Sequence, residues 1–159
     1  MAVSVGQKAP DFELVDNSNQ PIKLSNFKGK NVVLAFYPAA YSGVCDKEMC
    51  AFRDSMSEFN GMNAQVLGIA VDSRFTGARF AKDYDLKFPI LSDHQRSAIK
   101  AYGVEFPNFG MPGYTAALRS VFVIDGGGTI KWSWLAPSQG TEPPYDEVKK
   151  AVSALKKSR

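Results

Sequence analysis

Val32-Val-Leu-Ala-Phe-Tyr-Pro-Ala-Ala-Tyr-Ser-Gly-Val-Cys-Asp-Lys-Glu-Met-Cys50 is the stretch of this 159-residue chain that points most directly to its fold. Its first five residues are continuously apolar, which is typical of a strand buried on both faces of a sheet. Pro38 ends that strand, because proline has no backbone N–H to donate. After Ser42 apolar residues recur at helical spacing, which predicts a helix with one core-facing stripe made by Met49, Phe52, Met56 and Phe59.

Strands and helices alternate along the rest of the chain. Apolar runs at Val66–Val71 and Val121–Ile124 predict two more buried strands. The turn Asp125–Gly128 is followed by the alternating pattern of Thr129–Leu135, which predicts a hairpin with a half-covered outer strand. The other elements that we expect are short strands at Asp11–Val15 and Ile22–Leu24, a connection or short strand at Ile90–Leu91, helices from Ser73 to about Tyr84 and from Asp93 to Gly103, and a last helix beginning near Pro143 and Pro144.

This order of elements predicts an α/β protein. Buried strands followed by helices imply parallel crossovers, and the late hairpin adds an antiparallel edge. The expected architecture is a mixed central β-sheet flanked by helices, the pattern of a thioredoxin-like fold with an N-terminal extension. The length fits one domain over residues 1–159, because no linker, repeat or low-complexity tract divides the chain.

The positive charge is concentrated at the C-terminus. The formal net charge is +3, and residues 149–159 carry five positive charges and no acid. A basic C-terminal helix could contact nucleic acid or anionic lipid. The helical spacing of apolar residues predicts instead that this helix packs on the core and turns its lysines to solvent. We therefore expect no nucleic acid and no membrane among the partners; the apolar stripe consists of Val148, Ala151, Val152 and Leu155.

The sequence predicts neither a membrane span nor a secretory signal. The longest uncharged apolar run, near Val32–Tyr41, is about half the roughly 20 residues that a membrane helix needs. The first ten residues lack a basic segment followed by an apolar core, so we expect a cytoplasmic protein. For the oligomeric state we expect either a monomer or a homodimer. Two cysteines and one histidine, His94, are too few for a structural zinc site or a disulfide-stapled scaffold. The close pair Cys45 and Cys50 is therefore expected to be chemical rather than structural.

Cys45 lies in the first turn of the helix predicted after Ser42. A thiol in that turn is close to unpaired backbone N–H groups and to the positive end of the helix dipole, which both favour the nucleophilic thiolate. From position alone, an inert buried cysteine is an equally good interpretation. Ser42 offers a hydroxyl that can accept from a backbone N–H and donate to a bound oxygen.

Pro38, Ser42 and Cys45, at spacings of four and three, resemble the Pro-x-x-x-Thr/Ser-x-x-Cys active-site motif of the peroxiredoxins. The resemblance runs from about Gln7 to Asp125 and includes the opening Ala9-Pro-Asp-Phe12. Glu48 follows the cysteine by three residues, as is common in that family, and Arg119 opens the strand where the family places its catalytic arginine. The chain departs from the family in having Ser42 where threonine is usual. The hydroxyl is kept, but the methyl group that limits its rotation is lost.

The resemblance implies a thiol peroxidase that reduces hydrogen peroxide and small organic hydroperoxides, with no metal, haem or flavin. It implies that the Cys45 thiolate attacks a peroxide oxygen and becomes a sulfenic acid. Arg119 and Ser42, with the N–H of Val44 or Cys45, would stabilise the charge that develops. The implied role of Pro38 is to shield the site from water, and that of Glu48 is to orient the arginine. Electrons would come from thioredoxin or a similar dithiol protein.

Cys50 leaves two kinds of peroxidase open. A second cysteine five residues after the first resembles the Q-type, or bacterioferritin-comigratory, peroxiredoxins, whereas the rest of the chain also resembles the one-cysteine E-type, which an external thiol recycles. In an ideal helix the two Cα atoms are about 8–9 Å apart. The resemblance to the Q-type favours Cys50 as the residue that resolves the sulfenic acid on Cys45. Because a disulfide needs roughly 4.4–6.8 Å, this resolution would require the helix to unwind in part.

Two other classes of function and one segment stay open. A thiol redox sensor or holdase would use Cys45 to signal without turnover. A disulfide oxidoreductase is disfavoured, because its typical spacing is Cys-x-x-Cys and this chain has Cys-x-x-x-x-Cys. The irregular segment ahead of Arg119 could wall the peroxide pocket, cover a dimer contact or pack as an ordinary loop; its large apolar residues are Phe106, Phe109, Met111 and Tyr114.

Overall fold

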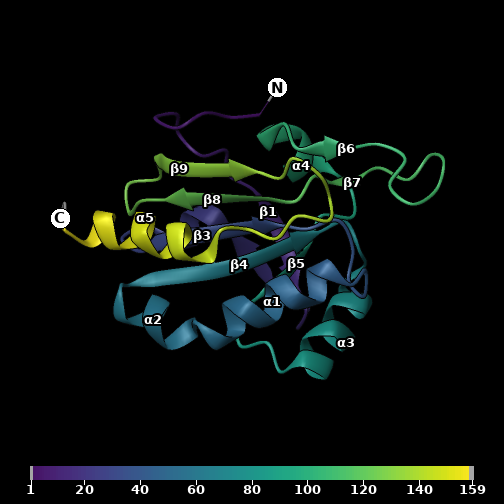
Figure 1. Cartoon of the computed structure of the whole chain (residues 1–159), viewed down its shortest axis with the longest axis horizontal. Helices are drawn as coiled ribbons and strands as arrows, with labels where there is room; N and C mark the ends of the chain where they lie inside the picture. Colours follow the sequence, from purple (N-terminus) through teal and green to yellow (C-terminus); the bar gives the residue numbers. More distant parts are fainter. Residues whose placement is uncertain (1, 158–159) are drawn as a thin grey trace.

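The computed structural model describes residues 2–157, apart from the side chains of Cys45, Lys156 and Lys157. Seven strands form one mixed sheet in the order β2-β1-β5-β4-β3-β8-β9 (Figure 1). At its centre, β3 (Asn31–Phe36) is parallel to β4 (Ala64–Ala70), as the buried apolar runs predict. β3 is therefore an interior strand between β4 and β8, and it delivers the loop that follows Phe36 to the carboxyl edge of the parallel strands.

The outer strands complete the sheet on both sides. β5 (Ile90–Ser92) is parallel to β4, and β8 (Ser120–Ile124) is antiparallel to β3. β9 (Ile130–Leu135) pairs with β8 and forms the predicted hairpin. This combination of a parallel centre and an antiparallel edge is the mixed sheet that the order of elements predicts.

The N-terminal extension forms the other edge of the sheet. β1 (Glu13–Asp16) pairs antiparallel with both β2 (Pro21–Lys23) and β5. Both strands overlap the predicted ranges, but their first and last residues differ from the prediction by one or two positions. Leu24 instead begins a short 3₁₀ helix, η1 (Leu24–Phe27), and the Asp11 carboxylate accepts from the backbone N–H of Ser25 at 3.0 Å.

Side chains of β3 alternate between two apolar cores, one on each face of the sheet. Val33 and Ala35 belong to one core, and Leu34 and Phe36 belong to the other. Both sets are fully buried, which is why the strand reads as continuously apolar. Helices cover the two faces unequally: the first core is covered by α1 (Val44–Asp54), α2 (Met56–Gly61), α3 (Arg74–Tyr84) and α5 (Tyr145–Lys157), and the second by α4 (Ser97–Tyr102).

Both predicted helix caps, Ser73 and Asp93, are present, but Asp93 is not at the standard N-cap position. The Ser73 hydroxyl accepts from the backbone N–H of Thr76 at 3.3 Å and begins α3 as expected. Asp93 lies further from α4 than a standard N-cap, because Arg96 occupies that position in a left-handed conformation. The buried Asp93 carboxylate nevertheless accepts from the backbone N–H groups of Ala98 and Ile99, at 3.0 and 2.9 Å, so it still caps the helix.

The predicted single stripe after Ser42 is divided between two helices. The chain leaves α1 at Ser55 and enters α2 one residue later. Met49, Phe52 and Phe59 are nonetheless all buried in the same core. The bend at Ser55 lets α2 contact β4 while the stripe stays against the sheet.

The small second sheet was not evident in the sequence pattern. β6 (Glu105–Phe106) pairs antiparallel with β7 (Ala116–Ala117), and the segment between them extends away from the sheet at the right of Figure 1. Two-residue strands carry no detectable alternation, which explains why this segment reads as irregular.

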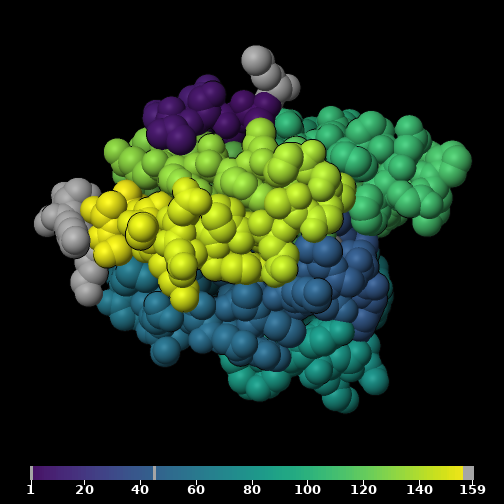
Figure 2. Space-filling model, in the orientation of Figure 1, coloured from purple at the N-terminus to yellow at the C-terminus, as the bar shows by residue number. Residues whose placement is uncertain are grey.

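The C-terminal helix packs as its apolar stripe predicts. Val148, Val152 and Leu155 are buried in the first core. Figure 2 shows the yellow C-terminal segment lying against the blue surface of α1 and α2, and Lys149 forms an ion pair with Glu58 of α2 at 3.2 Å. Arg159, one of the five positive charges of residues 149–159, lies outside the described residues. None of the helices within residues 2–157 has the length and apolar character that crossing a membrane requires.

Candidate active site

The loop that follows β3 is held in a fixed shape before α1 begins. Pro38 is buried, and the backbone N–H of Ala40 donates to the Asp72 carboxylate at 2.8 Å. The Ser42 hydroxyl donates to the carbonyl oxygen of Ala39, also at 2.8 Å. Gly43 then caps α1 with φ of 90°, a backbone angle that residues with a side chain rarely adopt. These contacts turn the chain from the strand into the helix at the carboxyl edge of β3.

Cys45 is the second residue of α1. The backbone N–H groups of a first helical turn have no intrahelical acceptor, so they contribute positive potential there. The backbone therefore places Cys45 at a helix N-terminus, as predicted. Its side chain lies outside the described part of the chain. Val44, the other residue expected to supply an N–H, is the first residue of the helix and is half-buried.

Arg119 and Glu48 form a fully buried ion pair across the first core. Arg119 Nη1 lies 2.6 Å from Glu48 Oε1, and the two side chains are 1% and 0% exposed. Glu48 is one helical turn after Cys45, so the pair places the guanidinium beside the first turns of α1. The structure thus brings together two residues that are 71 positions apart in the chain.

Burial and the arginine act on Glu48 in opposite directions. Burial raises the pKa of Glu48 to about 7, and the charge of Arg119 offsets only part of that rise. The second carboxylate oxygen, Oε2, is buried, and no hydrogen-bond partner for it lies among the described atoms. Burial therefore opposes the ionisation of Glu48, and the charge and hydrogen bond of Arg119 favour it.

Gln139 also fixes the position of Arg119, and no sequence pattern predicts this contact. The backbone N–H of Arg119 donates to Gln139 Oε1 at 2.8 Å, and its Nε donates to the Gln139 carbonyl oxygen at 3.0 Å. Gln139 in turn donates from Nε2 to the carbonyl oxygen of Ala117 at 3.0 Å. It comes from the irregular segment between β9 and α5, where no periodicity indicates which side chain points inward. Asp72 could have been found, because it follows the carboxyl end of β4 next to the end of β3.

Cys50 lies on α1 and is half-buried. Burial raises the pKa of its thiol, and the neighbouring Arg53 acts in the opposite direction. Because Cys45 and Cys50 lie in one uninterrupted helix, the ideal separation of about 8–9 Å between their Cα atoms applies to this conformation. The helix as it stands therefore keeps the two residues too far apart for a disulfide.

The apolar residues ahead of Arg119 divide between packing and exposure. Phe109 and Tyr114 pack against the second core, and Phe106 lies edge-on to Phe109 with ring centroids 6.2 Å apart. Met111, at the turn between them, is 59% exposed. Loop packing, one of the three interpretations that the sequence left open, accounts for Phe109 and Tyr114. His94 is exposed.

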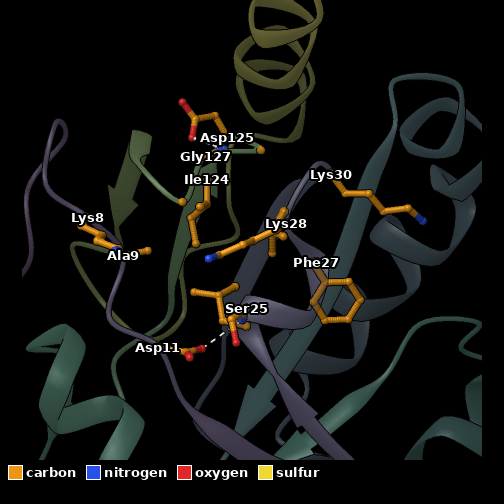
Figure 3. Close-up of a pocket in the computed structure, with 14 residues that line it drawn as sticks. Lys8, Ala9, Asp11, Ser25, Phe27, Lys28, Lys30, Ile124, Asp125 and Gly127 are labelled. Carbon is orange, nitrogen blue, oxygen red and sulfur yellow. Dashed lines mark hydrogen bonds between the residues drawn. The ribbon is translucent and has the colours of Figure 1, made fainter.

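A cavity of about 190 Å³ lies at the other end of the sheet (Figure 3). Val32 and Ile124 pair with each other there, whereas Phe36 and Ser120 pair at the end that carries the candidate site. Four residues of strand separate the two ends, about 13 Å. The cavity is therefore not part of the site. The lining residues labelled in Figure 3 are Lys8, Ala9, Asp11, Ser25, Phe27, Lys28, Lys30, Ile124, Asp125 and Gly127.

Comparison with known proteins gives a consistent family. The AhpC/TSA family matches residues 5–133. The chain is 39% identical over 155 residues to chloroplastic peroxiredoxin Q of Sedum lineare, covering 97% of this chain and 80% of that protein. It is 37% identical over 136 residues to peroxiredoxin Bcp of Bacillus subtilis, covering 84% of this chain and 86% of that protein.

A solved structure agrees with the sequence relatives. The crystal structure of peroxidoxin BcpB from Mycobacterium tuberculosis superimposes with a TM-score of 0.81 at 32% identity, covering 98% of this chain and 97% of that one. The predicted thioredoxin-like fold is confirmed by this likeness and by the mixed seven-stranded sheet. The chain belongs to the AhpC/TSA family and is a peroxiredoxin, a thiol-dependent peroxidase.

Proposed function

We propose that this chain reduces hydrogen peroxide and small organic hydroperoxides through Cys45, that Cys50 then forms a disulfide with Cys45, and that thioredoxin or a similar dithiol protein restores both thiols. The observation that carries the proposal is the buried Arg119–Glu48 ion pair one turn from Cys45. A buried cation beside a helix N-terminus favours a thiolate and stabilises a departing oxygen anion.

The first step consumes the peroxide. The Cys45 thiolate attacks one peroxide oxygen, so that an S–O bond forms while the O–O bond breaks. The other oxygen takes up a proton and leaves as water or an alcohol, and Cys45 becomes a sulfenic acid. Arg119 is held in place by Glu48 and Gln139, so its N–H groups need no reorganisation as negative charge develops.

The second step returns the enzyme to its reduced form. The Cys50 thiol attacks the sulfenic sulfur, an S–S bond forms and water leaves. A dithiol reductant then exchanges with the disulfide and carries away the two electrons as its own disulfide. Since the intact helix keeps Cys45 and Cys50 too far apart, the first turn of α1 must open before this bond forms.

Loss of Cys50 tests the two-cysteine mechanism. In Cys50→Ser the reaction of Cys45 with peroxide is expected to survive, whereas turnover with thioredoxin falls and overoxidised Cys45 accumulates, because no internal thiol captures the sulfenic acid. Trypsin cuts between the two cysteines at Lys47, so in the wild type a disulfide formed with one equivalent of peroxide joins peptides 31–47 and 48–53 in the mass spectrum.

Two outcomes would favour the rivals. Turnover of Cys50→Ser with thioredoxin at the wild-type rate would make Cys50 a bystander and assign the chain to the one-cysteine type. Oxidation of Cys45 without any turnover, under excess peroxide and several reductants, would favour a redox sensor.

The Ser42 hydroxyl is expected to contribute less than the cysteine. Ser42→Ala removes the hydroxyl together with its hydrogen bond to the Ala39 carbonyl oxygen, so we expect peroxide oxidation to slow by about 10- to 100-fold. Ser42→Thr keeps the hydroxyl and restricts its rotation, so it should retain or improve the rate. Stopped-flow measurement of Cys45 oxidation checks both variants, and an inactive Ser42→Thr enzyme would contradict the assigned role.

A further inference from the structure

Two tyrosine hydroxyls tie the beginning of α1 to the end of α3. Tyr84 Oη donates to Asp46 Oδ2 at 2.6 Å, and Tyr41 Oη donates to Asp83 Oδ2 at 2.8 Å. The first bond holds the residue that directly follows Cys45. Both bonds have a carboxylate acceptor, which makes them stronger than hydrogen bonds between neutral groups.

The Tyr84–Asp46 bond is built into a packed contact. The rings of Tyr41 and Tyr84 both lie edge-on to Phe80, with centroids 5.3 and 5.4 Å from it. The other carboxylate oxygen of Asp46, Oδ1, is buried, and no hydrogen-bond partner for it lies among the described atoms. Tyr84 therefore supplies a hydrogen bond to the Asp46 carboxylate, one oxygen of which is shielded from water.

The tie also reaches the end of α1. Arg53 Nη1 donates to the backbone carbonyl oxygen of Tyr84 at 2.6 Å. Tyr84 of α3 thus contacts α1 near both of its ends, at Asp46 and at Arg53. Opening the first turn can leave the Arg53 contact in place, but it displaces Asp46 together with its neighbour Cys45.

We propose that Tyr84, through Asp46, is a positioning residue that holds the first turn of α1 folded, and that this hydrogen bond must break before Cys50 can reach oxidised Cys45. The release step rests on the proposed role of Cys50. The sulfenic acid on Cys45 has two fates: it condenses with the Cys50 thiol and loses water, or it reduces a second peroxide to water or alcohol and becomes a sulfinic acid. A tighter first turn delays the first fate and so favours the second.

Tyr84→Phe is the sharpest variant, because it removes the hydroxyl and keeps the ring against Phe80. We expect disulfide formation after a stoichiometric pulse of peroxide to become about five- to tenfold faster, and sulfinic acid per turnover to fall by a similar factor. Timed alkylation followed by mass spectrometry measures both products. General damage to the site would lower both products, whereas the proposal predicts that disulfide formation rises while sulfinic acid falls.

Tyr102→Phe is the matched control. The Tyr102 hydroxyl donates to the carbonyl oxygen of Pro10 at 2.7 Å, on the opposite face of the sheet from α1. This variant also loses one tyrosine hydrogen bond, and it is expected to leave the rate of disulfide formation unchanged. Asp46→Asn added to Tyr84→Phe should give little further acceleration, because both changes remove the same bond.

Hydrogen exchange separates this inference from the role of Cys50. In the reduced protein, the backbone amides of residues 46–49 should exchange about five- to tenfold faster in Tyr84→Phe than in the wild type or Tyr102→Phe. Wild-type exchange and wild-type disulfide formation in Tyr84→Phe would overturn the proposal. Faster exchange with no Cys45–Cys50 disulfide in any variant would reject Cys50 as the resolving residue and support the restraint by Tyr84.

Discussion

Cys45→Ser is expected to abolish peroxide reduction. A serine hydroxyl is hardly ionised near neutral pH, so neither the helix N-terminus nor Arg119 can turn it into a useful nucleophile. The measurement is peroxide consumption under a fixed excess of dithiol reductant, compared with the wild type. Retention of a sizeable fraction of the wild-type rate would remove Cys45 from its assigned role.

The matched control for Cys45→Ser is Cys50→Ser, which makes the same chemical change five residues later in the same helix. It should keep the first, stoichiometric consumption of peroxide that Cys45→Ser loses. If both variants lost that first consumption equally, the defect would lie in the helix and not in the nucleophile.

Arg119→Ala is expected to slow the oxidation of Cys45 by about 100- to 1,000-fold, because a preorganised charged donor is removed. The same change should raise the pKa of the Cys45 thiol, since a nearby cation favours the thiolate. Both effects are measured in a Cys50→Ser background, where the ultraviolet absorbance of thiolate reports Cys45 alone. An unchanged titration curve in Arg119→Ala would show that the guanidinium does not act on Cys45.

Arg119→Lys separates charge from geometry. Arg119 donates from Nη1 to Glu48 and from Nε to Gln139 at the same time, which a single ammonium group at the end of a lysine does not reproduce. We expect Arg119→Lys to recover part of the thiolate pKa and less of the rate. Full recovery of the rate would mean that only the positive charge matters.

The Arg119→Ala variant also has a stability signature that depends on pH. Arg119 lowers the pKa of Glu48, so its loss should raise that pKa further, above about 7. A carboxyl group with a raised pKa in the folded state binds its proton more tightly there than in the unfolded chain. Its contribution to stability is therefore lost as the pH rises from about 4.5 to above 7. Denaturant unfolding at about pH 5 and pH 8 should show a larger fall for Arg119→Ala than for the wild type.

Much of the scaffold could be predicted because its signals are local. The continuous apolar run of β3, the Ser73 cap of α3 and the alternation along β9 each depend on neighbours within a few residues. The break between α1 and α2 at Ser55 could not be read in the same way. Met49, Phe52 and Phe59 keep helical spacing across the break, so nothing in the local pattern marks it, and the contact of α2 with β4 is known only from the folded structure.

The local pattern of residues predicts the reactive groups: a cysteine in the first turn of a helix, a hydroxyl three residues before it, and a strand that brings both to the edge of a sheet. The side chains that surround these groups come from distant parts of the chain, so they are known only from the folded structure. Glu48 accepts from Arg119, which lies 71 residues later in the chain. The carbonyl oxygen of Gln139, in an irregular segment, accepts from the same arginine. Tyr84 of α3 donates a hydrogen bond to Asp46 of α1. The spacing of apolar residues predicts the type of secondary structure and which of its faces is buried. These contacts depend instead on how the helices pack on the sheet, and no short sequence pattern specifies that packing.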